Sequence, residues 1–304
     1  MLIISHKNDI DGMGGVVLLK LACNDVDYIL CEDYNINQIV MKEYLEGNLD
    51  KYEKIFITDL HLNDKCSSFI NKTSIKDKLV IFDHNESVTH LNSYPFANIV
   101  ISKDGKLCCS TTLLYEYLTS NNMLKPNHAL DTFCEATRIY DIGQWELNGQ
   151  NQTPRDLSLL YEIYGPDKYI DVMTKKLKRN SKHFLLNKFE RESIKLRKEL
   201  IQQTVMSYIG NMDYKNICGH KAGIAYISYA FRNEVAQCLR KNNTKNIDVV
   251  ILISLDNSSI SIRNIKTDVN VRPIAEKLGG KGHFGAGGCY INEDNIDEVL
   301  KIVL

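Results

Sequence analysis

Short apolar runs that each end in polar side chains restrict the fold of this chain more than any other feature. Leu2–Ile4, Lys54–Thr58 and Lys78–Phe82 are three such runs, Ala97–Ile101 is a fourth, and a helical pattern over Met13–Cys23 follows the first. Short, continuous apolar strands separated by helices are typical of a parallel sheet that is buried on both faces. This pattern therefore predicts that the N-terminal part of the chain folds as an α/β domain with a parallel sheet.

Potential metal ligands follow the first three strands directly. They are His6, Asp9 and Asp11 after the first strand, Asp59 after the second, and Asp83, His84 and Asn85 after the third. In open parallel sheets, ligands bind at the carboxyl ends of the strands. We therefore expect the three groups to converge on one site.

Each group also has an ordinary structural explanation when it is taken alone. Asp9 and Asp11 could cap the helix that follows them, although that helix N-terminus would equally favour an anion. Asp59 could cap a turn, and His61 could be a neighbour of the site or a plain loop histidine. The residues alone leave these alternatives open.

Two further features concern the acidic residues. An acidic side chain beside an imidazole, as in Asp83-His84, often orients a metal-binding histidine.

We predict two helices farther along the chain. The first begins near Ser110, which would be its N-cap, and the second spans Ala129–Tyr140. Asp141 falls at the end of the second helix.

The pattern changes twice after this domain. The chain is helical and charged over residues 155–208, where the apolar residues Leu185, Phe189, Leu196 and Leu200 form one stripe that indicates packing between helices. Strand signals return from Ile217 and lead to a glycine-rich turn at residues 279–288. We predict a sheet domain over residues 1–150, a helical connector over residues 151–210, and a smaller α/β domain over residues 211–304.

Composition argues against several classes of protein. The formal net charge of the 304 residues is −1, so a broad basic surface for duplex DNA is not expected. No apolar run approaches the roughly 20 residues that a membrane-spanning helix needs, and the N-terminus lacks the pattern of a signal peptide. The nine scattered cysteines include no C-x-x-C pair and are interpreted as reduced, buried thiols. We predict a cytoplasmic protein that binds neither duplex DNA nor membranes.

The motifs of the first domain, taken in order, resemble those of the DHH phosphoesterase superfamily. His6–Gly12 reads H-x-x-D-x-D-G, and Asp59, the D-H-N of Asp83–Asn85 and Asp141 follow it. The likeness extends to the C-terminal domain associated with this superfamily. There, Gly279–Gly288 is similar to its G-G-x-G-H-x-x-A-x-G motif. The strand Ser261–Arg263 matches its arginine-bearing strand, and the chain most resembles the bacterial nano-RNases, which are of oligoribonuclease type.

This resemblance implies a centre of two divalent cations. One ion would be held by His6, Asp9 and Asp59, and the other by Asp11, Asp59, His84 and Asp141, with Asp59 bridging. Such a thiol-free set of carboxylates and imidazoles suits manganese better than zinc, with magnesium or cobalt as alternatives. Two ions could share a hydroxide and stabilise both oxygens of an in-line displacement.

The resemblance also implies that the C-terminal domain binds the rest of the substrate. The residues concerned are Arg263, Gly280, Lys281, Gly282 and His283. Arg263 can grip a phosphate as a bidentate fork, and the glycine amides could reach a terminal phosphate. The active site would lie in the cleft between the domains, which would suit about two to five nucleotides, and closure of the domains would exclude water and complete the site.

The third motif departs from the superfamily at Asn85, where a second histidine is usual. In the superfamily that histidine contacts the scissile phosphate. Asn85 can donate a hydrogen bond but cannot act as a proton donor near neutral pH. We therefore expect metal binding to be kept, and the rate or substrate choice to differ.

By this resemblance, the expected activity is that of a 3′-to-5′ exonuclease that degrades short oligoribonucleotides to mononucleotides, with Asp59, His84 and Asn85 as catalytic residues. Hydrolysis of a cyclic or linear dinucleotide, or of the 3′-phosphate of 3′,5′-bisphosphoadenosine, is the main alternative. A catalytically weak nucleotide-binding regulator is an alternative of another class. The sequence leaves open whether the protein forms a homodimer.

Overall fold

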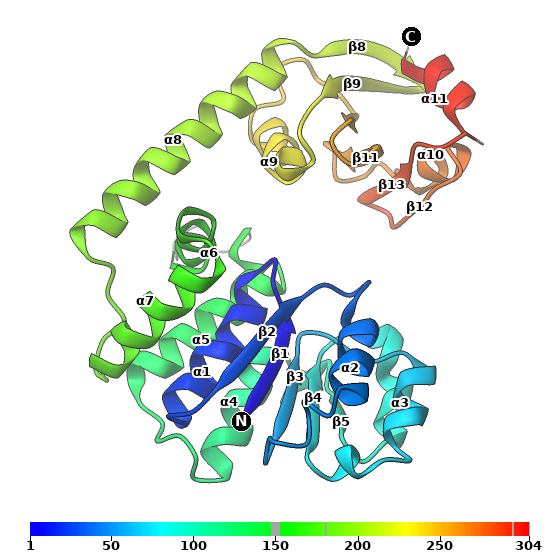
Figure 1. Ribbon diagram of the computed structural model, residues 1–304. Coiled ribbons are helices and arrows are strands. Elements are labelled where there is room, and N and C mark those ends of the chain that lie inside the picture. The colour runs from blue at the N-terminus through cyan, green and yellow to red at the C-terminus, as the bar shows by residue number, and fades with distance from the viewer. Residues whose placement is uncertain (147–152, 180, 294, 304) are drawn as a thin grey trace. The chain divides into compact units, whose positions relative to one another are not determined.

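A computed structural model describes residues 1–146, 153–179, 181–293 and 295–303 of the chain. The chain divides into two compact units, Met1–Ile194 and Lys195–Leu304 (Figure 1). The helical connector predicted over residues 151–210 is shared between these units, and each unit is described by itself.

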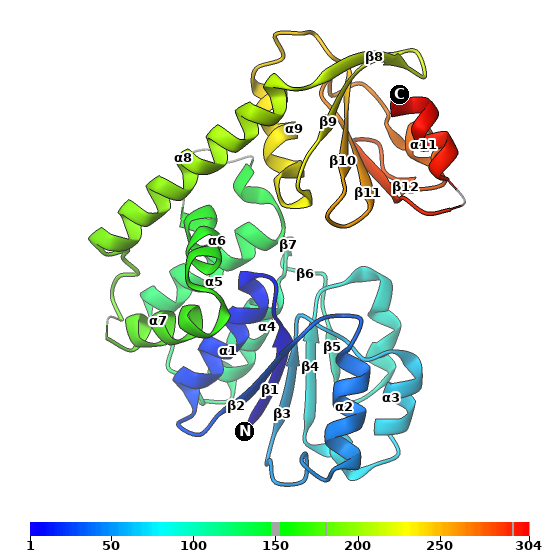
Figure 2. The ribbon, with the colours of Figure 1, turned by 45° about the horizontal axis from the view of Figure 1, so that its top comes forward.

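The predicted parallel sheet forms the centre of the first unit, and it has five strands where the sequence predicted four (Figure 2). Its strands are β1 (Leu2–His6), β2 (Asp27–Cys31), β3 (Ile55–Thr58), β4 (Leu79–Asp83) and β5 (Ala97–Ile99), in the order β2-β1-β3-β4-β5. A separate small sheet pairs β6 (Ser102–Lys103) with β7 (Lys106–Leu107). The carboxyl ends of β1, β3 and β4 carry the three predicted groups of ligands.

Helices cover both faces of the parallel sheet (Figure 2). The helices of this unit are α1 (Ile10–Ala22), α2 (Ile36–Leu45), α3 (Asp64–Ile70), α4 (Ser110–Ser120), α5 (His128–Asp141), α6 (Thr153–Tyr164) and α7 (Pro166–Arg179), with 3-10 helices at Ser74–Asp77, Glu86–Ser93 and Gln144–Glu146. The apolar side chains of α2 and α3 cluster with Ile4, Ile57 and Ile81 of the sheet. On the opposite face, Phe56 and Phe82 meet the ring of Tyr117 in α4. Burial on both faces explains why the strands are continuously apolar.

The first two helices of the predicted connector belong to the first unit because each buries an apolar stripe. Leu157 and Leu160 of α6 are buried, and so are Tyr169 and Met173 of α7. α6 packs against α5, and α7 packs against α1. These contacts place both helices beside the sheet domain.

The long helix α8 (Lys188–Gly210) runs from the first unit into the second. The packing predicted for Leu185, Phe189, Leu196 and Leu200 is wrong, because these side chains are 52–65% exposed and Leu185 precedes the helix. The buried apolar residues of α8, Ile194 and Val205, lie on the opposite side of the helix at 3.6 residues per turn. The helix therefore packs through a different face from the one its apolar pattern predicts.

A six-stranded sheet forms the second unit, which is the smaller α/β domain expected. Its strands are β8 (Asp213–Ile217), β9 (His220–Tyr226), β10 (Val249–Ser254), β11 (Ser259–Asn264), β12 (Lys281–Gly282) and β13 (Ala286–Tyr290), in the order β12-β13-β11-β10-β9-β8. β9 and β10 are parallel, and the other neighbours are antiparallel. Its helices are α9 (Arg232–Lys241), α10 (Arg272–Lys277) and α11 (Ile296–Val303), with a 3-10 helix at Tyr229–Phe231.

The two faces of this second sheet differ in what covers them. Ile262 of β11 lies in the cluster with α10, whereas Leu252 of β10 lies in the cluster with α9. Because side chains alternate along a strand, Ser259, Ser261 and Arg263 of β11 lie on the same face as α9. The apolar side chains of α9 cluster with β9 and β10, and the polar part of this face lies over β11 and β13.

Across both units, none of the described helices is long and apolar enough to span a membrane.

Candidate active site

Asp9 stands at the N-terminus of α1 and makes two kinds of contact. Its Oδ1 accepts hydrogen bonds from the backbone N–H groups of Asp11 and Gly12, at 3.1 and 3.0 Å, and so caps the helix. Its Oδ2 lies 2.7 Å from Nδ1 of His6, the last residue of β1. A helix cap and a ligand for a cation are therefore compatible, because they use different oxygens.

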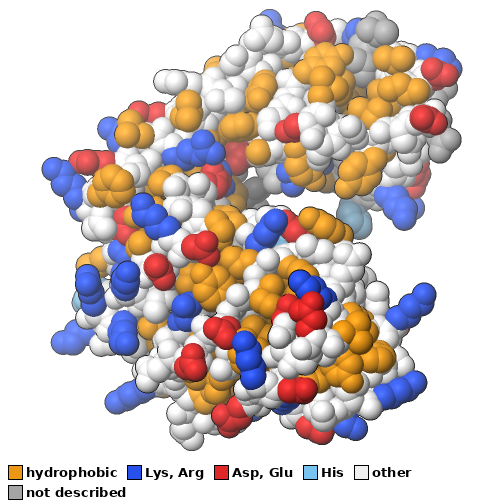
Figure 3. Space-filling model, viewed as in Figure 1, with side chains coloured by type: hydrophobic (Ala, Val, Ile, Leu, Met, Phe, Trp, Pro, Cys, Tyr) orange, Lys and Arg blue, Asp and Glu red, His pale blue; other side chains and the backbone are white. Residues whose placement is uncertain are grey.

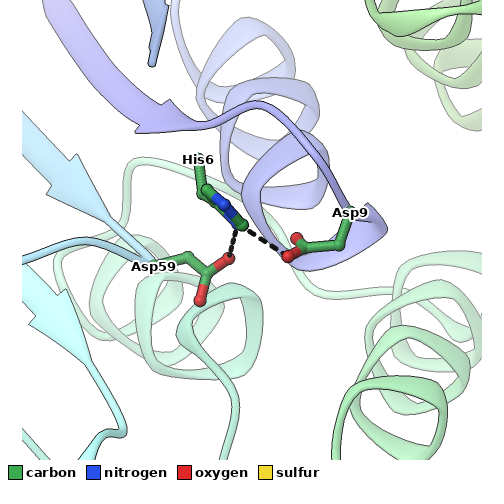
Figure 4. Close-up of side chains that lie close together, drawn as sticks. All are labelled: His6, Asp9 and Asp59. Carbon is green, nitrogen blue, oxygen red and sulfur yellow. Dashed lines mark hydrogen bonds and ion pairs between the residues drawn. The ribbon is translucent and has the colours of Figure 1, made fainter. Parts of the chain in front are cut away.

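Asp59 follows β3 directly and places its carboxylate between two histidines. Its Oδ2 lies 3.2 Å from Nδ1 of His6 (Figure 4), and its Oδ1 lies 3.6 Å from Nε2 of His84. The backbone φ of Asp59 is 58°, in the left-handed region that side chains rarely adopt. Strain of this kind is concentrated at functional sites. A single carboxylate thus reaches both groups of ligands, as a bridging residue must.

His84 lies among the remaining acidic side chains. Its Nε2 lies 3.8 Å from Oδ2 of Asp11 and 3.3 Å from Oδ2 of Asp141, which ends α5 as the sequence predicts. Two groups of ligand atoms, each within 4.8 Å of one another, are formed by His6, Asp9 and Asp59 and by Asp11, Asp59 and His84. The six residues predicted to hold metal therefore lie together, and Asp59 belongs to both groups.

The N-terminus of α4 fixes Asp11, which the sequence did not reveal. The backbone N–H groups of Ser110 and Thr111 donate to its Oδ2 and Oδ1, both at 2.8 Å, and the Asp11 side chain is fully buried. Cys109, rather than the predicted Ser110, is the N-cap of this helix. Positive potential at the helix N-terminus stabilises the buried carboxylate.

Asp83 shapes the loop after β4 instead of orienting the ring of His84. Its Oδ2 lies 2.8 Å from Nδ1 of His61, and its Oδ1 accepts hydrogen bonds from the backbone N–H groups of His84 and Asn85. The orienting role expected for Asp83 is therefore wrong. Asn85 is exposed, and its side-chain oxygen accepts a hydrogen bond from the N–H of Ser87 at 3.0 Å. Its side-chain amide nitrogen is the group that can donate to a ligand.

Burial and like charges disturb the carboxylates at the centre. Burial, together with the charges of Asp9 and Asp11, raises the pKa of Asp59 well above its usual range. Burial and the charge of Asp11 also raise the pKa of Asp141 to about 8. The Oδ2 atom of Asp141 is buried without a hydrogen bond. The surrounding side chains therefore do not fully balance the negative charge of these carboxylates.

The two histidines are shifted in the direction that supplies part of this charge. Burial disfavours their charged forms, but interaction with Asp59 and the other carboxylates outweighs it. The carboxylates therefore raise the pKa of His6 to about 11 and the pKa of His84 to about 9. Divalent cations bound by the same atoms would replace these protons and remove the repulsion, so the residues fit a metal centre.

Binding of manganese is expected to release protons, because the ions bind unprotonated side chains. Asp141, His6 and His84 have raised pKa values and hold protons at neutral pH. Raising the pH lowers the concentration of protons that compete with the metal for these side chains, so the apparent affinity should rise at least about tenfold between about pH 6.5 and about pH 7.5. Calorimetry in two buffers of different ionisation enthalpy measures the protons released. Equal heats in both buffers and an affinity independent of pH would contradict this account.

The exposed pair formed by Asp64 and His90 offers a control for the proton measurement. Oδ1 of Asp64 lies 2.9 Å from Nε2 of His90, and both side chains are more than half exposed. The variant Asp64→Asn should leave both the metal affinity and the number of released protons unchanged.

A pocket of about 690 Å³ in the second unit gathers the residues predicted to bind the rest of the substrate. Its lining includes Arg263, Gly280, Lys281, Gly282 and His283. Arg263 donates from Nη1 to the carbonyl groups of Ile262, at 3.0 Å, and Gly287, at 3.3 Å. The guanidinium is thereby held on the polar face of the sheet.

The glycines of the turn serve close packing of the backbone. A Cβ at Gly280 would lie 2.2 Å from the carbonyl oxygen of Gly288, and a Cβ at Gly282 would lie 2.7 Å from Cα of Gly287. The N–H of Gly280 donates to the carbonyl of Ala275 at 2.9 Å. The expectation that this amide reaches a phosphate is therefore wrong for Gly280.

Glu32 is a neighbour of the metal ligands that the motifs did not reveal. Its Oε2 lies 3.5 Å from Nε2 of His6 and accepts a hydrogen bond from the side-chain amide of Asn8 at 2.6 Å. Tyr161 of α6 donates from its hydroxyl to the carbonyl of Lys7. Glu32 follows β2 directly, so a prediction of that strand would have placed Glu32 at the same edge of the sheet as His6.

Comparison with known proteins identifies relatives of the whole chain. No family model matches it. The oligoribonuclease NrnB of Bacillus subtilis is 30% identical over an alignment of 296 residues, and the match covers 95% of this chain and 72% of that protein.

Solved structures share the fold at low identity. The pGpG-specific phosphodiesterase PggH from Vibrio cholerae is 15% identical with a TM-score of 0.56, and the alignment covers 99% of this chain and 96% of that one. The exonuclease RecJ bound to manganese is 13% identical with a TM-score of 0.54, over 99% and 89% of the two chains. The DHH domain of a member of the s1p family of ribosomal proteins is 12% identical with a TM-score of 0.58, over 99% and 85%.

Proposed function

Because the chain belongs to the family of the oligoribonuclease NrnB within the DHH phosphoesterases, we propose that it degrades short oligoribonucleotides to mononucleotides as a metal-dependent 3′-to-5′ exonuclease. It is a hydrolase of phosphodiester bonds. The observation that carries the proposal is the meeting of six potential ligands, with Asp59 between His6 and His84.

We propose manganese as the resident metal, with magnesium or cobalt able to take the same positions. His6, Asp9 and Asp59 would hold one ion, and Asp11, Asp59, His84 and Asp141 would hold the other. Carboxylate and imidazole ligands without thiolate suit manganese, and the RecJ structure with this fold is described as bound to manganese. When bound, two divalent cations would lower the pKa of a water so that it supplies a hydroxide, and they would stabilise the entering and leaving oxygens.

The protein would contribute binding and orientation around the scissile phosphate. Asn85 would donate from its side-chain amide to a non-bridging phosphate oxygen, since its side-chain oxygen already accepts a hydrogen bond from Ser87. Arg263, Lys281 and His283 line one pocket and would bind a phosphate farther along the substrate. Asn85 cannot donate a proton, so the leaving group would receive its proton from solvent or another group.

Short substrates agree with the charge on the surface. On the face of the first unit visible in Figure 3, lysine and arginine side chains are mixed with aspartate and glutamate, and the whole chain has a net charge of −1. Long nucleic acids are held without sequence preference by many cationic contacts to phosphate. A few cations in a site are sufficient for a few phosphates.

A panel of substrates tests the proposed function. Labelled dinucleotides, five-mers, longer RNA strands, 3′,5′-bisphosphoadenosine and cyclic dinucleotides would be incubated with the protein and manganese. We expect kcat/KM to be highest for linear RNA of about two to five nucleotides and to fall at least about tenfold for long strands, since a chain with a net charge of −1 lacks the cationic surface that the phosphates of the excess length would need. If the bisphosphate or a cyclic dinucleotide is hydrolysed faster than short linear RNA, the assignment of short RNA as the substrate is wrong.

A further inference from the structure

Two tyrosines and an arginine that no sequence motif includes also line the pocket of the second unit. They are Tyr229, Arg232 and Tyr290. Tyr290 ends β13 and is 72% exposed, so packing of the core does not explain its position. An exposed ring at the wall of a pocket can stack on a planar ligand.

The register of the sheet places Tyr290 on the same face as Arg263. In the antiparallel pair of β11 and β13, Arg263 lies opposite Ala286, and Ser259 lies opposite Tyr290. Residues directly opposite each other share a face, and so do residues two and four apart along a strand. Arg263 and Ser259 are four positions apart along β11, so about 13 Å of sheet separates the cationic end from the aromatic end.

Small residues form the floor between these two ends. Ser261 lies opposite Gly288 at the midpoint of the span. A Cβ at Gly288 would lie 2.4 Å from the carbonyl oxygen of Ile260, so the glycine lets the two strands pair closely. The floor is therefore polar and low, and it leaves room for a ligand that runs from Arg263 to Tyr290.

Tyr229 is fixed at the same end of the sheet as Tyr290. Its backbone N–H donates to the carboxylate of Asp256, in the turn between β10 and β11 that leads to Ser259. The guanidinium carbon of Arg232 lies 3.7 Å from the centre of the Tyr229 ring, and Nη1 donates to the carbonyl of Tyr229 at 2.9 Å. Stacking and a hydrogen bond thus hold both groups before any ligand binds.

We propose that the aromatic end of this pocket, formed by Tyr290 with the stacked pair Tyr229 and Arg232, binds a nucleobase while Arg263 and Lys281 bind the phosphate of the same nucleotide. This inference rests on the proposed function for the class of ligand and names the part of the substrate that the second unit recognises. The pocket volume of about 690 Å³ lies within the range of sites for small ligands. Because every base has a π-face, binding should depend only weakly on which base is present.

Binding of mononucleotides to the metal-free full-length chain tests the proposal without any turnover. Calorimetry in EDTA would compare adenosine 5′-monophosphate with ribose 5-phosphate, which has the same phosphate and sugar but no base. We expect the nucleotide to bind at least about tenfold more tightly than ribose 5-phosphate, as stacking on an aromatic side chain implies. Equal affinities for the two ligands would overturn the proposal.

Variants of Tyr290 separate stacking from other effects of the side chain. Tyr290→Ala should weaken nucleotide binding about tenfold and leave ribose 5-phosphate binding unchanged, whereas Tyr290→Phe should retain binding because it keeps the ring. Tyr229→Ala should weaken nucleotide binding in the same way. Unchanged nucleotide affinity in Tyr290→Ala would contradict the assignment. Tyr214→Ala is the matched control, since Tyr214 lies on β8 at the opposite edge of the sheet and should have no effect.

The result is independent of the test of the proposed function. If the protein binds the nucleotide through Tyr290 but does not hydrolyse short RNA, the nucleobase site stands and the substrate assignment fails. If it hydrolyses short RNA while Tyr290→Ala leaves KM and nucleotide affinity unchanged, the nucleobase site fails and the function stands.

Discussion

Asp59→Asn is expected to lower kcat/KM on a short oligoribonucleotide by about three orders of magnitude or more, because it removes the carboxylate shared by both proposed ions. Asn is the best replacement because it tolerates the left-handed backbone at this position, where φ is 58°. The variant should also lose at least one of the two manganese ions in calorimetry. Steady-state assays with and without added manganese measure the first effect.

The same substitution should not weaken the metal-free fold. Burial and neighbouring acidic groups raise the pKa of Asp59 above its usual range, so the ionised form opposes folding at neutral pH. An uncharged amide removes that cost. The melting temperature in EDTA should therefore be equal to or higher than that of the original chain. Activity within about tenfold of the original would contradict a bridging role.

Gly12→Ala is expected to destabilise the chain by about 3 kcal/mol or more and to abolish activity with it. A Cβ at this position would lie 2.0 Å from the carbonyl oxygen of His6, which is a backbone atom and cannot turn away as a flexible side chain could. α1 would have to move away from β1, which displaces His6 and Asp11 from the centre. Urea denaturation followed by circular dichroism measures the loss of stability.

Gly210 provides the control for this substitution. It ends α8, and a Cβ there would have no atom within 4 Å. Gly210→Ala should be neutral or stabilise the chain by up to about 1 kcal/mol, since alanine favours the helix. A loss of stability as large as that of Gly12→Ala would show that the contact with His6 is not the cause.

Much of the first domain could be predicted because its strands carry strong local signals. β1, β3 and β4 are short and continuously apolar, and the residues that follow each one meet at one edge of the sheet. β2 was not predicted, since it is an edge strand of mixed polarity. Glu32, which follows β2, was therefore missed as a neighbour of His6.

Contacts between distant segments could not be predicted. The support of Asp11 by Ser110 and Thr111 joins residues about a hundred positions apart. No periodicity or spacing signals such a pair, because it depends on how α4 packs beside α1. The exposed stripe on α8 shows the converse, since a regular apolar pattern does not state whether a partner covers it.

The second unit shows the same division. A strand at Ser261–Arg263 was predicted and lies within β11, and the alternation along β11 places Arg263 with Ser259 and Ser261 on the pocket face. Tyr229 and Tyr290 lie about sixty residues apart and belong to no motif. The pairing of β11 with β13 is what brings Tyr290 to the same face as Arg263.

Anomalous scattering from manganese is the most direct test of the central claim that the two groups of side chains hold cations. Crystals grown with manganese would be measured at its absorption edge. Two peaks about 3.5–4 Å apart, both within bonding distance of Asp59, are expected between His6 and His84. A single peak away from Asp59, or no peak at this edge of the sheet at saturating manganese, would contradict the account.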